Sequence, residues 1–200
     1  MNQVKIYIFD TKKYSFEDLV KRFPVSNEEL ETFDSILNIR YKKERYISLI
    51  MKKRLIGNYS IEKNKKPVSN NKFFNVSHSN GVVILGISES NEIGVDIEEI
   101  KPFNENVKDK IANKKEKKYI QNDSNFYEIW TAKEAILKMD GCGLIYKLHL
   151  VPSLPLNSLK LFKNTPVFVK TSRIINQVIS IAIKGTEEFD FSIIDFDYKE

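Results

Sequence analysis

Ile93-Gly94-Val95-Asp96-Ile97-Glu98-Glu99-Ile100 is the stretch that decides the fold, because it reads as a largely buried strand in the middle of the chain. Pro102 follows almost at once and marks a break. On each side of this break, helical patterns come first and antiparallel-type strands follow. The sequence therefore predicts an α+β fold of two similar α/β halves, residues 1–100 and 101–200. We expect a pseudo-duplication with the functional site at the interface of the halves.

Hydrophobic periodicity, capping residues and turn residues predict the individual elements. The segment 58–71 is polar and is expected to be a loop, and Gly141 and Gly143 are expected to close the last helix. We expect helices at 15–23, 28–37, 41–56, 104–121 and 123–140, and strands at 4–9, 73–76, 81–87, 93–100, 159–162, 167–171, 178–183 and 189–194.

The composition is that of an ordinary globular protein, with 42% apolar and 30% charged residues. No apolar run approaches the roughly 20 residues needed to span a bilayer. The only cysteine, Cys142, excludes an intramolecular disulfide, and the N-terminus enters a strand pattern without a signal-peptide core. We therefore predict a cytoplasmic protein without a membrane partner.

The net charge of +5 is concentrated in one segment. Residues 40–72 contain eleven Lys or Arg against two Glu, Glu44 and Glu62. Such a local excess predicts a polyanionic ligand or partner, although any single lysine there is as well explained by a solvated helix face. Nucleic acid is one polyanion to consider, but neither zinc-finger spacing nor an aromatic RNA-binding motif is present.

Asp96 and Glu98 are the first pair of candidate functional residues. Residues two apart on a strand point to the same face, so these carboxylates project together while Val95 and Ile97 enter the core. Adjacent carboxylates repel unless a cation or a proton lies between them, and a hard divalent ion is the natural occupant. The plainer alternative is a strand edge with exposed acids.

The segment from Trp130 to Lys138 carries the second candidate group. On a helix, Glu134 and Lys138 lie one turn apart and side by side. An ordinary surface ion pair is the plainer alternative. Glu134 also lies close to the apolar stripe marked by Trp130, and a charge pair bordering a buried face needs partners such as a metal and a phosphate.

Ser77-His78-Ser79, in the stretch Phe73-Phe74-Asn75-Val76-Ser77-His78-Ser79-Asn80-Gly81, is the third candidate group. Hydroxyl and imidazole donors at the end of a strand suit phosphate oxygens. A Ser/His hydrolase is rejected because neighbours on one strand end do not face each other, and because no nucleophile elbow is present.

Taken in order, these three groups resemble the signature of the Sfp-type 4′-phosphopantetheinyl transferases. Lys66-Pro67 resembles a further short element of that family, although Lys65 stands where the family usually has glycine. Arg45 and Arg54 fall as the paired arginines of the family do. The similarity extends over residues 40–144, and the chain length resembles that of the monomeric, two-halved type.

The resemblance implies a transferase that moves 4′-phosphopantetheine from coenzyme A to a serine of an apo acyl or peptidyl carrier protein and releases 3′,5′-ADP. The carrier could serve fatty acid, polyketide or nonribosomal peptide synthesis, and no nucleic-acid partner is expected. The resemblance also implies the following roles: Mg²⁺ held by Asp96, Glu98 and Glu134; coenzyme A phosphates held by Arg45, Arg54, Lys66, Ser77, His78, Lys133 and Lys138; and catalysis by Lys138 with Glu134 or Glu116 as proton acceptor.

Two other functions stay open at this point. A basic nucleic-acid-binding module explains residues 40–72 but leaves the three groups unexplained. A Mg²⁺-dependent phosphodiesterase acting on coenzyme A or a nucleotide shares the metal site. Dependence on an acceptor protein distinguishes it from the transferase.

Overall fold

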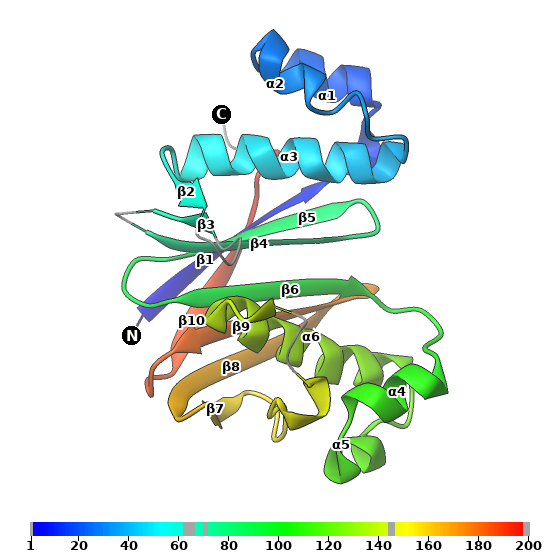
Figure 1. The fold of residues 1–200 in the computed structure, drawn as a ribbon, viewed down its shortest axis with the longest axis vertical. Coiled ribbons are helices and arrows are strands. Elements are labelled where there is room, and N and C mark those ends of the chain that lie inside the picture. The colour runs from blue at the N-terminus through cyan, green and yellow to red at the C-terminus, as the bar shows by residue number, and fades with distance from the viewer. Residues whose placement is uncertain (1, 62–66, 70–71, 144–146, 198–200) are drawn as a thin grey trace.

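Two stacked sheets, each covered on its outer face by one long helix, form the body of the protein (Figure 1). The computed structural model describes residues 2–61, 67–69, 72–143 and 147–197. The prediction of a mixed α+β fold is confirmed. Lys66, one of the predicted phosphate-binding residues, lies outside the described residues.

The first sheet has the strand order β10-β1-β5-β4 and is accompanied by the helices of the N-terminal half. β1 pairs with β10 in parallel, and the other two pairings are antiparallel. The elements of this half are β1 (Asn2–Asp10), η1 (Thr11–Lys13), α1 (Phe16–Arg22), α2 (Asn27–Glu31), α3 (Ile39–Leu55), β2 (Ser60–Ile61), β3 (Pro67–Val68), β4 (Phe73–Ser79), β5 (Val82–Ser88) and, from the far end of the chain, β10 (Phe189–Asp195).

The second sheet has the strand order β6-β9-β8-β7 and is antiparallel throughout. Helix α6 packs across it, and α4 and α5 lie beside α6 in the lower part of Figure 1. The elements of this half are β6 (Ile93–Glu99), α4 (Glu105–Ile111), α5 (Lys114–Tyr119), α6 (Asp123–Asp140), η3 (Leu148–Leu150), β7 (Ser158–Phe162), β8 (Thr165–Ile174) and β9 (Gln177–Lys184).

The sheets do not divide the chain at residue 100. β6 precedes that position but pairs with β9 in the second sheet, and β10 returns to pair with β1 in the first sheet. The strand that was expected to end the first half therefore begins the second sheet. The two halves exchange one strand each relative to a simple split of the sequence.

Alternating side chains explain how the sheets stack. On β1 and β5, one face supplies Val4, Ile6, Val82 and Ile84 to a core between the sheets, and the other face packs beneath α1 and α3. β6 places Val95 and Ile97 in the same central core. Since residues of a strand alternate between its faces, Asp96 and Glu98 project on the opposite side, toward α6.

Local capping explains where three helix predictions need correction. The predicted helix 28–37 ends at Glu31, and a turn follows before Asn38 caps α3 through the amide of Tyr41. The predicted helix 104–121 is two short helices, because Asn113 accepts hydrogen bonds from the Lys115 and Glu116 amides and starts α5 anew. The N-cap of α6 is Asn122, one residue before the expected position.

The strand predictions hold with small shifts in their bounds, and the short pair β2–β3 lies in the segment that was expected to be a loop. The Ser77-His78-Ser79 segment belongs to β4 itself, and the turn comes after it at Asn80-Gly81. Within the described ranges, no helix has the length and apolar character needed to cross a membrane.

Candidate active site

The site is built where the edge strands of the two sheets, β4 and β6, lie side by side. They are joined by side chains of β4 that bind backbone amides of β6. The amides of Val95, Ile97 and Glu99 donate to Asn75 Oδ1 at 3.1 Å, Ser77 Oγ at 3.4 Å and Ser79 Oγ at 3.3 Å, respectively. Because successive side chains of a strand alternate between its faces, Asn75, Ser77 and Ser79 form a row that satisfies the exposed edge of β6.

Gly94 brings helix α6 close to β6. A Cβ at this position would lie 2.0 Å from the Ala135 carbonyl oxygen and 2.4 Å from the Met139 amide nitrogen. Only glycine permits this approach without moving the helix backbone. The contact places the α6 residues Glu134 and Lys138 beside the strand residue Asp96. Residues 94, 96, 134 and 138, which are far apart in the sequence, are thereby brought together.

Three carboxylates gather at this contact without enough positive charge to balance them. Burial, and next the charge of Asp96, raise the pKa of Glu134 to about 7. The same two causes raise the pKa of Glu98. Asp96 Oδ2 and Glu134 Oε1 are buried and have no hydrogen-bond partner among the described residues. Buried acceptor oxygens left unpaired are costly, so the donor set suits a hard cation with oxygen ligands.

Lys138 supplies the positive charge that pairs directly with Asp96. Its Nζ lies 2.6 Å from Asp96 Oδ1 and donates to Ser77 Oγ at 2.8 Å, and Ser77 in turn donates to Asp96 Oδ1 at 2.8 Å. Ser77 therefore positions Asp96 and Lys138. The Ser77 hydroxyl was expected to bind phosphate, but here it is hydrogen-bonded to Asp96 of β6 and Lys138 of α6.

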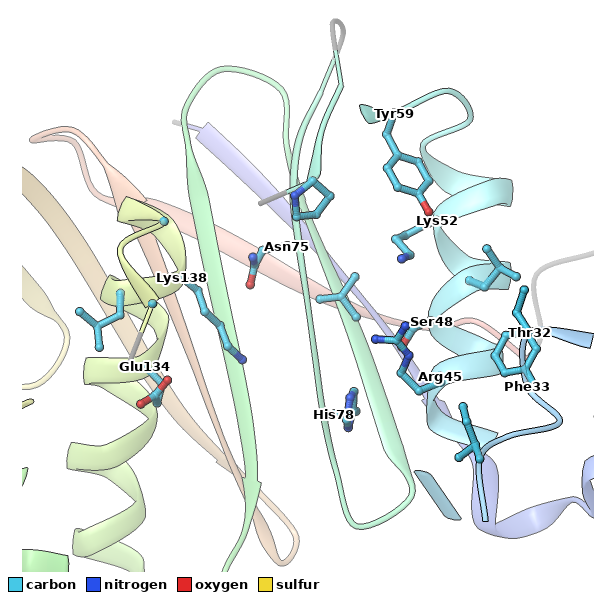
Figure 2. Close-up of a pocket in the computed structure, with 17 residues that line it drawn as sticks. Thr32, Phe33, Arg45, Ser48, Lys52, Tyr59, Asn75, His78, Glu134 and Lys138 are labelled. Atoms are coloured by element: carbon cyan, nitrogen blue, oxygen red, sulfur yellow. The ribbon is translucent and has the colours of Figure 1, made fainter. Parts of the chain in front are cut away.

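Beside this cluster is a pocket of about 670 Å³. Figure 2 shows Glu134 and Lys138 of α6 on one side, Arg45, Ser48 and Lys52 of α3 on the other, and Asn75 and His78 of β4 between them. The turn after α2 contributes Phe33, and Tyr59 closes the upper end in this view. The volume is in the range of small-molecule and cofactor sites.

The two walls of the pocket differ in charge. The α6 wall carries Lys138 and Glu134, the one member of the carboxylate cluster that lines the pocket, and the α3 wall carries Arg45 and Lys52. His78 belongs to the basic side, with its Nδ1 3.0 Å from Glu44 Oε2 and its ring 5.7 Å from the ring of Tyr41. An elongated polyanion with a metal-binding group at one end suits this arrangement.

Three of the predicted site residues that the structure describes lie outside both the pocket and the carboxylate cluster. Arg54 is exposed and stacks on the ring of Phe23, with Cζ 4.8 Å from the ring centroid. Lys133 and Glu116 form a buried ion pair at 2.8 Å, with side chains 0% and 1% exposed. Neither of them lines the pocket. The phosphate-binding role expected for Arg54 and Lys133 and the catalytic role expected for Glu116 are therefore not supported by the geometry.

The Lys133–Glu116 pair is instead tied into the surrounding backbone. Lys133 Nζ donates to the carbonyl oxygens of Leu148 and Val151, both at 2.9 Å. Glu116 Oε1 accepts from the Ser153 hydroxyl at 2.6 Å, and Oε2 caps α5 through the Asn113 amide at 2.8 Å. The pair holds α5 and the segment 148–153 against α6, which is a structural role.

Sequence reasoning missed several residues in and around the pocket, and Glu44, which lies behind the pocket residue His78, is the most informative. It is 4% exposed in a helix otherwise rich in lysine and arginine, and it contacts both His78 and the Asn80-Gly81 turn. The sequence feature that could have identified Glu44 is its isolation as an acidic residue within the basic segment 40–72. Asn75 lies within the stretch that the sequence singled out, but its bond to the Val95 amide depends on the pairing of two sheets.

The three carboxylates lie near one another, but their described arrangement does not have the geometry of a metal centre. Within the part of the chain that the structure describes, no group of three or more His, Cys, Asp or Glu side chains meets the geometry of a metal centre. The fit of the three carboxylates to a metal ion thus rests on the unpaired oxygens of Asp96 and Glu134 and on the raised pKa values of Glu98 and Glu134.

Comparison with known proteins points to the same class that the motifs predicted. Residues 92–174 match the family model of the 4′-phosphopantetheinyl transferase superfamily. The chain is 35% identical over 121 residues to the 4′-phosphopantetheinyl transferase ffp of Bacillus subtilis, covering 50% of each protein. It is 29% identical over 161 residues to the 4′-phosphopantetheinyl transferase gsp of Aneurinibacillus migulanus, covering 70% of this chain and 62% of that protein.

A third relative is the 4′-phosphopantetheinyl transferase Sfp of Bacillus subtilis strain 168, which is 35% identical over 91 residues, or 42% of this chain and 37% of that protein. The chain spans about half the length of the curated relatives it matches. The resemblance to the Sfp-type 4′-phosphopantetheinyl transferases is therefore confirmed, and it extends through the β6 and α6 residues of the carboxylate cluster.

Proposed function

We propose that this protein transfers the 4′-phosphopantetheine group of coenzyme A to a serine of an apo carrier protein and releases 3′,5′-ADP. The observation that carries the proposal is the two-walled pocket, with Glu134 and Lys138 facing the basic side formed by Arg45, Lys52 and His78. Coenzyme A carries a 3′-phosphate and a 5′-diphosphate on its ribose, so its two phosphate groups match the two walls. Relatives named for this activity support the proposal.

Asp96, Glu98 and Glu134 are the proposed ligands of one Mg²⁺ ion. Two unpaired buried oxygens, one on Asp96 and one on Glu134, support this assignment, as do the burial and charge repulsion that raise the pKa values of Glu98 and Glu134. When bound, the ion would neutralise charge on the pyrophosphate of coenzyme A. Ser77 keeps Asp96 in place, and Ser79 does the same for Glu98 through a bond of 2.7 Å to Oε2.

The chemical step is a substitution at phosphorus. The serine oxygen of the carrier forms a bond to the β-phosphorus of coenzyme A, the bond to the bridging oxygen breaks, and 3′,5′-ADP leaves with that oxygen. Lys138 stabilises the charge that develops on the phosphoryl oxygens. Glu134 is the proposed acceptor of the serine proton, because it lines the pocket whereas Glu116 is enclosed by Lys133, Ser153 and the start of α5.

The pocket lies between α3, which covers the first sheet, and α6, which covers the second. This location supports the proposal that the active site is formed at the interface of two halves. The presence of one long helix and one four-stranded sheet in each half supports their origin by duplication. We propose that the working unit is a monomer, since residues of both walls come from one chain.

The test of the function is the intact mass of an apo carrier protein after incubation with this protein, coenzyme A and Mg²⁺. A mass gain of one phosphopantetheine that is lost on addition of a chelator supports the transferase. Hydrolysis of coenzyme A at the same rate with and without the carrier would instead indicate the phosphodiesterase. If the protein neither transfers phosphopantetheine nor binds coenzyme A, the assignment of the pocket is refuted.

Arg45 and Arg54 provide a matched comparison within one helix. Arg45→Ala should weaken coenzyme A binding about tenfold, because a charged hydrogen bond to phosphate contributes about 1.5–3 kcal/mol. Arg54→Ala should leave the affinity nearly unchanged, since Arg54 stacks on Phe23 outside the pocket. Isothermal titration with coenzyme A measures both, and equal losses would show that the pocket has been assigned to the wrong face of α3.

A further inference from the structure

Glu44 is a buried acid that none of the roles above uses. It lies on α3 between Lys43 and Arg45, yet its side chain is turned into the protein and only 5% exposed. Burying a carboxylate costs free energy unless charged or hydrogen-bonding partners compensate. Its partners therefore indicate why an acid is kept at this position.

The carboxylate has two partners, one on each oxygen. Oε1 accepts the Gly81 amide at 2.5 Å, and Oε2 lies 3.0 Å from His78 Nδ1. Burial acts to raise the pKa of Glu44, but the hydrogen bonds from His78 and Gly81 outweigh it, so the pKa is lowered and the group is ionised. An ionised carboxylate can only accept hydrogen bonds, which requires Nδ1 of His78 to carry a hydrogen.

Among the described residues, the contacts of the His78 ring involve Nδ1 and one side of the ring and leave Nε2 without a partner. Tyr41 packs against one side of the ring, and Glu44 holds Nδ1, while the side chain remains 31% exposed and lines the pocket. Nε2 is then the ring nitrogen available to a ligand. If a phosphate oxygen accepts from Nε2 while Glu44 accepts from Nδ1, both nitrogens carry hydrogen and the imidazole is a cation between two anions.

The turn next to His78 is anchored independently of Glu44. The Gly81 carbonyl oxygen accepts the Thr11 hydroxyl at 2.7 Å and the Thr11 amide at 2.8 Å. Arg40 Nη1 also donates to Asn80 Oδ1 at 2.8 Å. Since these bonds secure the turn between β4 and β5, the bond from Glu44 to His78 is not needed to hold the turn in place.

We propose that Glu44 is a positioning residue for His78, which fixes the hydrogen on Nδ1 and turns Nε2 toward a phosphate group of the ligand. The part of this inference that concerns coenzyme A rests on the proposed function. The part that concerns the ring of His78 does not. Glu44 itself makes no contact with the pocket and acts through the imidazole.

Glu44→Gln is the informative substitution because it keeps the size of the side chain. A glutamine replaces one acceptor oxygen by an NH₂ donor, so it cannot accept from both the Gly81 amide and His78 Nδ1. Two-bond ¹H–¹⁵N spectra of the imidazole report which nitrogen carries the hydrogen. The chain has two histidines, and His149→Gln, a change outside the pocket, assigns the signals.

In the unsubstituted protein we expect His78 to carry hydrogen on Nδ1, and in Glu44→Gln we expect this pattern to be lost. Coenzyme A should bind Glu44→Gln about tenfold more weakly, with kcat at saturating coenzyme A nearly unchanged. In a His78→Ala background, Glu44→Gln should cause no further loss of affinity.

A hydrogen on Nε2 alone in the unsubstituted protein overturns the proposal, even if Glu44→Gln does not fold. So does an unchanged ring pattern in Glu44→Gln, or an equal loss of affinity with and without His78. If the unsubstituted protein binds no coenzyme A, the proposed function fails, and the ring pattern alone then decides whether Glu44 positions His78.

Discussion

Glu134→Gln should lower kcat/KM for coenzyme A by about 10²–10³-fold and, at the same time, make the metal-free protein more stable to heat. The loss of activity follows from the proposed roles of Glu134 as metal ligand and proton acceptor. The gain in stability follows from the charges, since burial and the nearby Asp96 and Glu98 raise the pKa of Glu134 to about 7. A neutral amide removes one of three repelling carboxylates, replaces the unpaired Glu134 Oε1, and brings an NH₂ donor beside the unpaired Asp96 Oδ2.

Two measurements test this prediction: the rate of carrier modification with Mg²⁺, and the thermal midpoint in the presence of a chelator. The matched control is Glu128→Gln, because Glu128 lies fewer than two turns before Glu134 on the same helix, α6, and is also buried. Although burial acts to raise the pKa of Glu128, its bonds to Arg173, Tyr119 and Asn125 lower it, so its charge is compensated. The control should lose stability and keep its activity when folded.

The two variants should thus change stability in opposite directions. If Glu134→Gln melts below the unsubstituted protein in chelator, the cluster is not under charge repulsion. If it retains near-normal transfer, Glu134 is neither a ligand nor the proton acceptor. Stability traded for function in this way is typical of sites whose charges are compensated only when a ligand binds.

The sequence was sufficient to predict the parts of the fold that depend on local patterns. The largely apolar run 93–100 predicted a buried strand, and side-chain alternation along it predicted the shared face of Asp96 and Glu98; both predictions agree with the structure. The helix that carries Glu134 and Lys138 was predicted for the same reason. These features depend on periodicity of 2 or 3.6 residues, which a single sequence displays directly.

Long-range features could not be predicted in this way. Nothing in residues 189–195 indicates that they pair in parallel with β1, because strand alternation does not specify a partner. The same holds for Ser77, whose hydroxyl was expected at a phosphate and is taken up by Asp96 and Lys138. Lys133 was ambiguous for a different reason: a lysine next to a site residue on a helix points 100° away from it, and only the packing partner reveals its role.

Lys133→Met should cost about 3–5 kcal/mol of unfolding free energy, because removing one partner of a buried ion pair leaves the other charge uncompensated. The substitution leaves the Glu116 charge buried, 1% exposed, with only the Ser153 hydroxyl and the Asn113 amide as partners. It also frees two buried carbonyl oxygens, those of Leu148 and Val151. Urea unfolding monitored by circular dichroism measures the change.

The double variant Lys133→Met/Glu116→Gln separates a structural pair from a catalytic one. A glutamine at 116 can still cap α5 through its amide oxygen, and its NH₂ can donate to a carbonyl oxygen that Lys133 released. We expect this variant to recover a large part of the lost stability and to transfer phosphopantetheine at a near-normal rate. Lys53→Met, which breaks the exposed pair with Glu29, should cost less than about 1 kcal/mol. A double variant that is stable but inactive would support a catalytic role for Glu116. Its carboxylate charge would then be required for the reaction itself and not merely for pairing with Lys133.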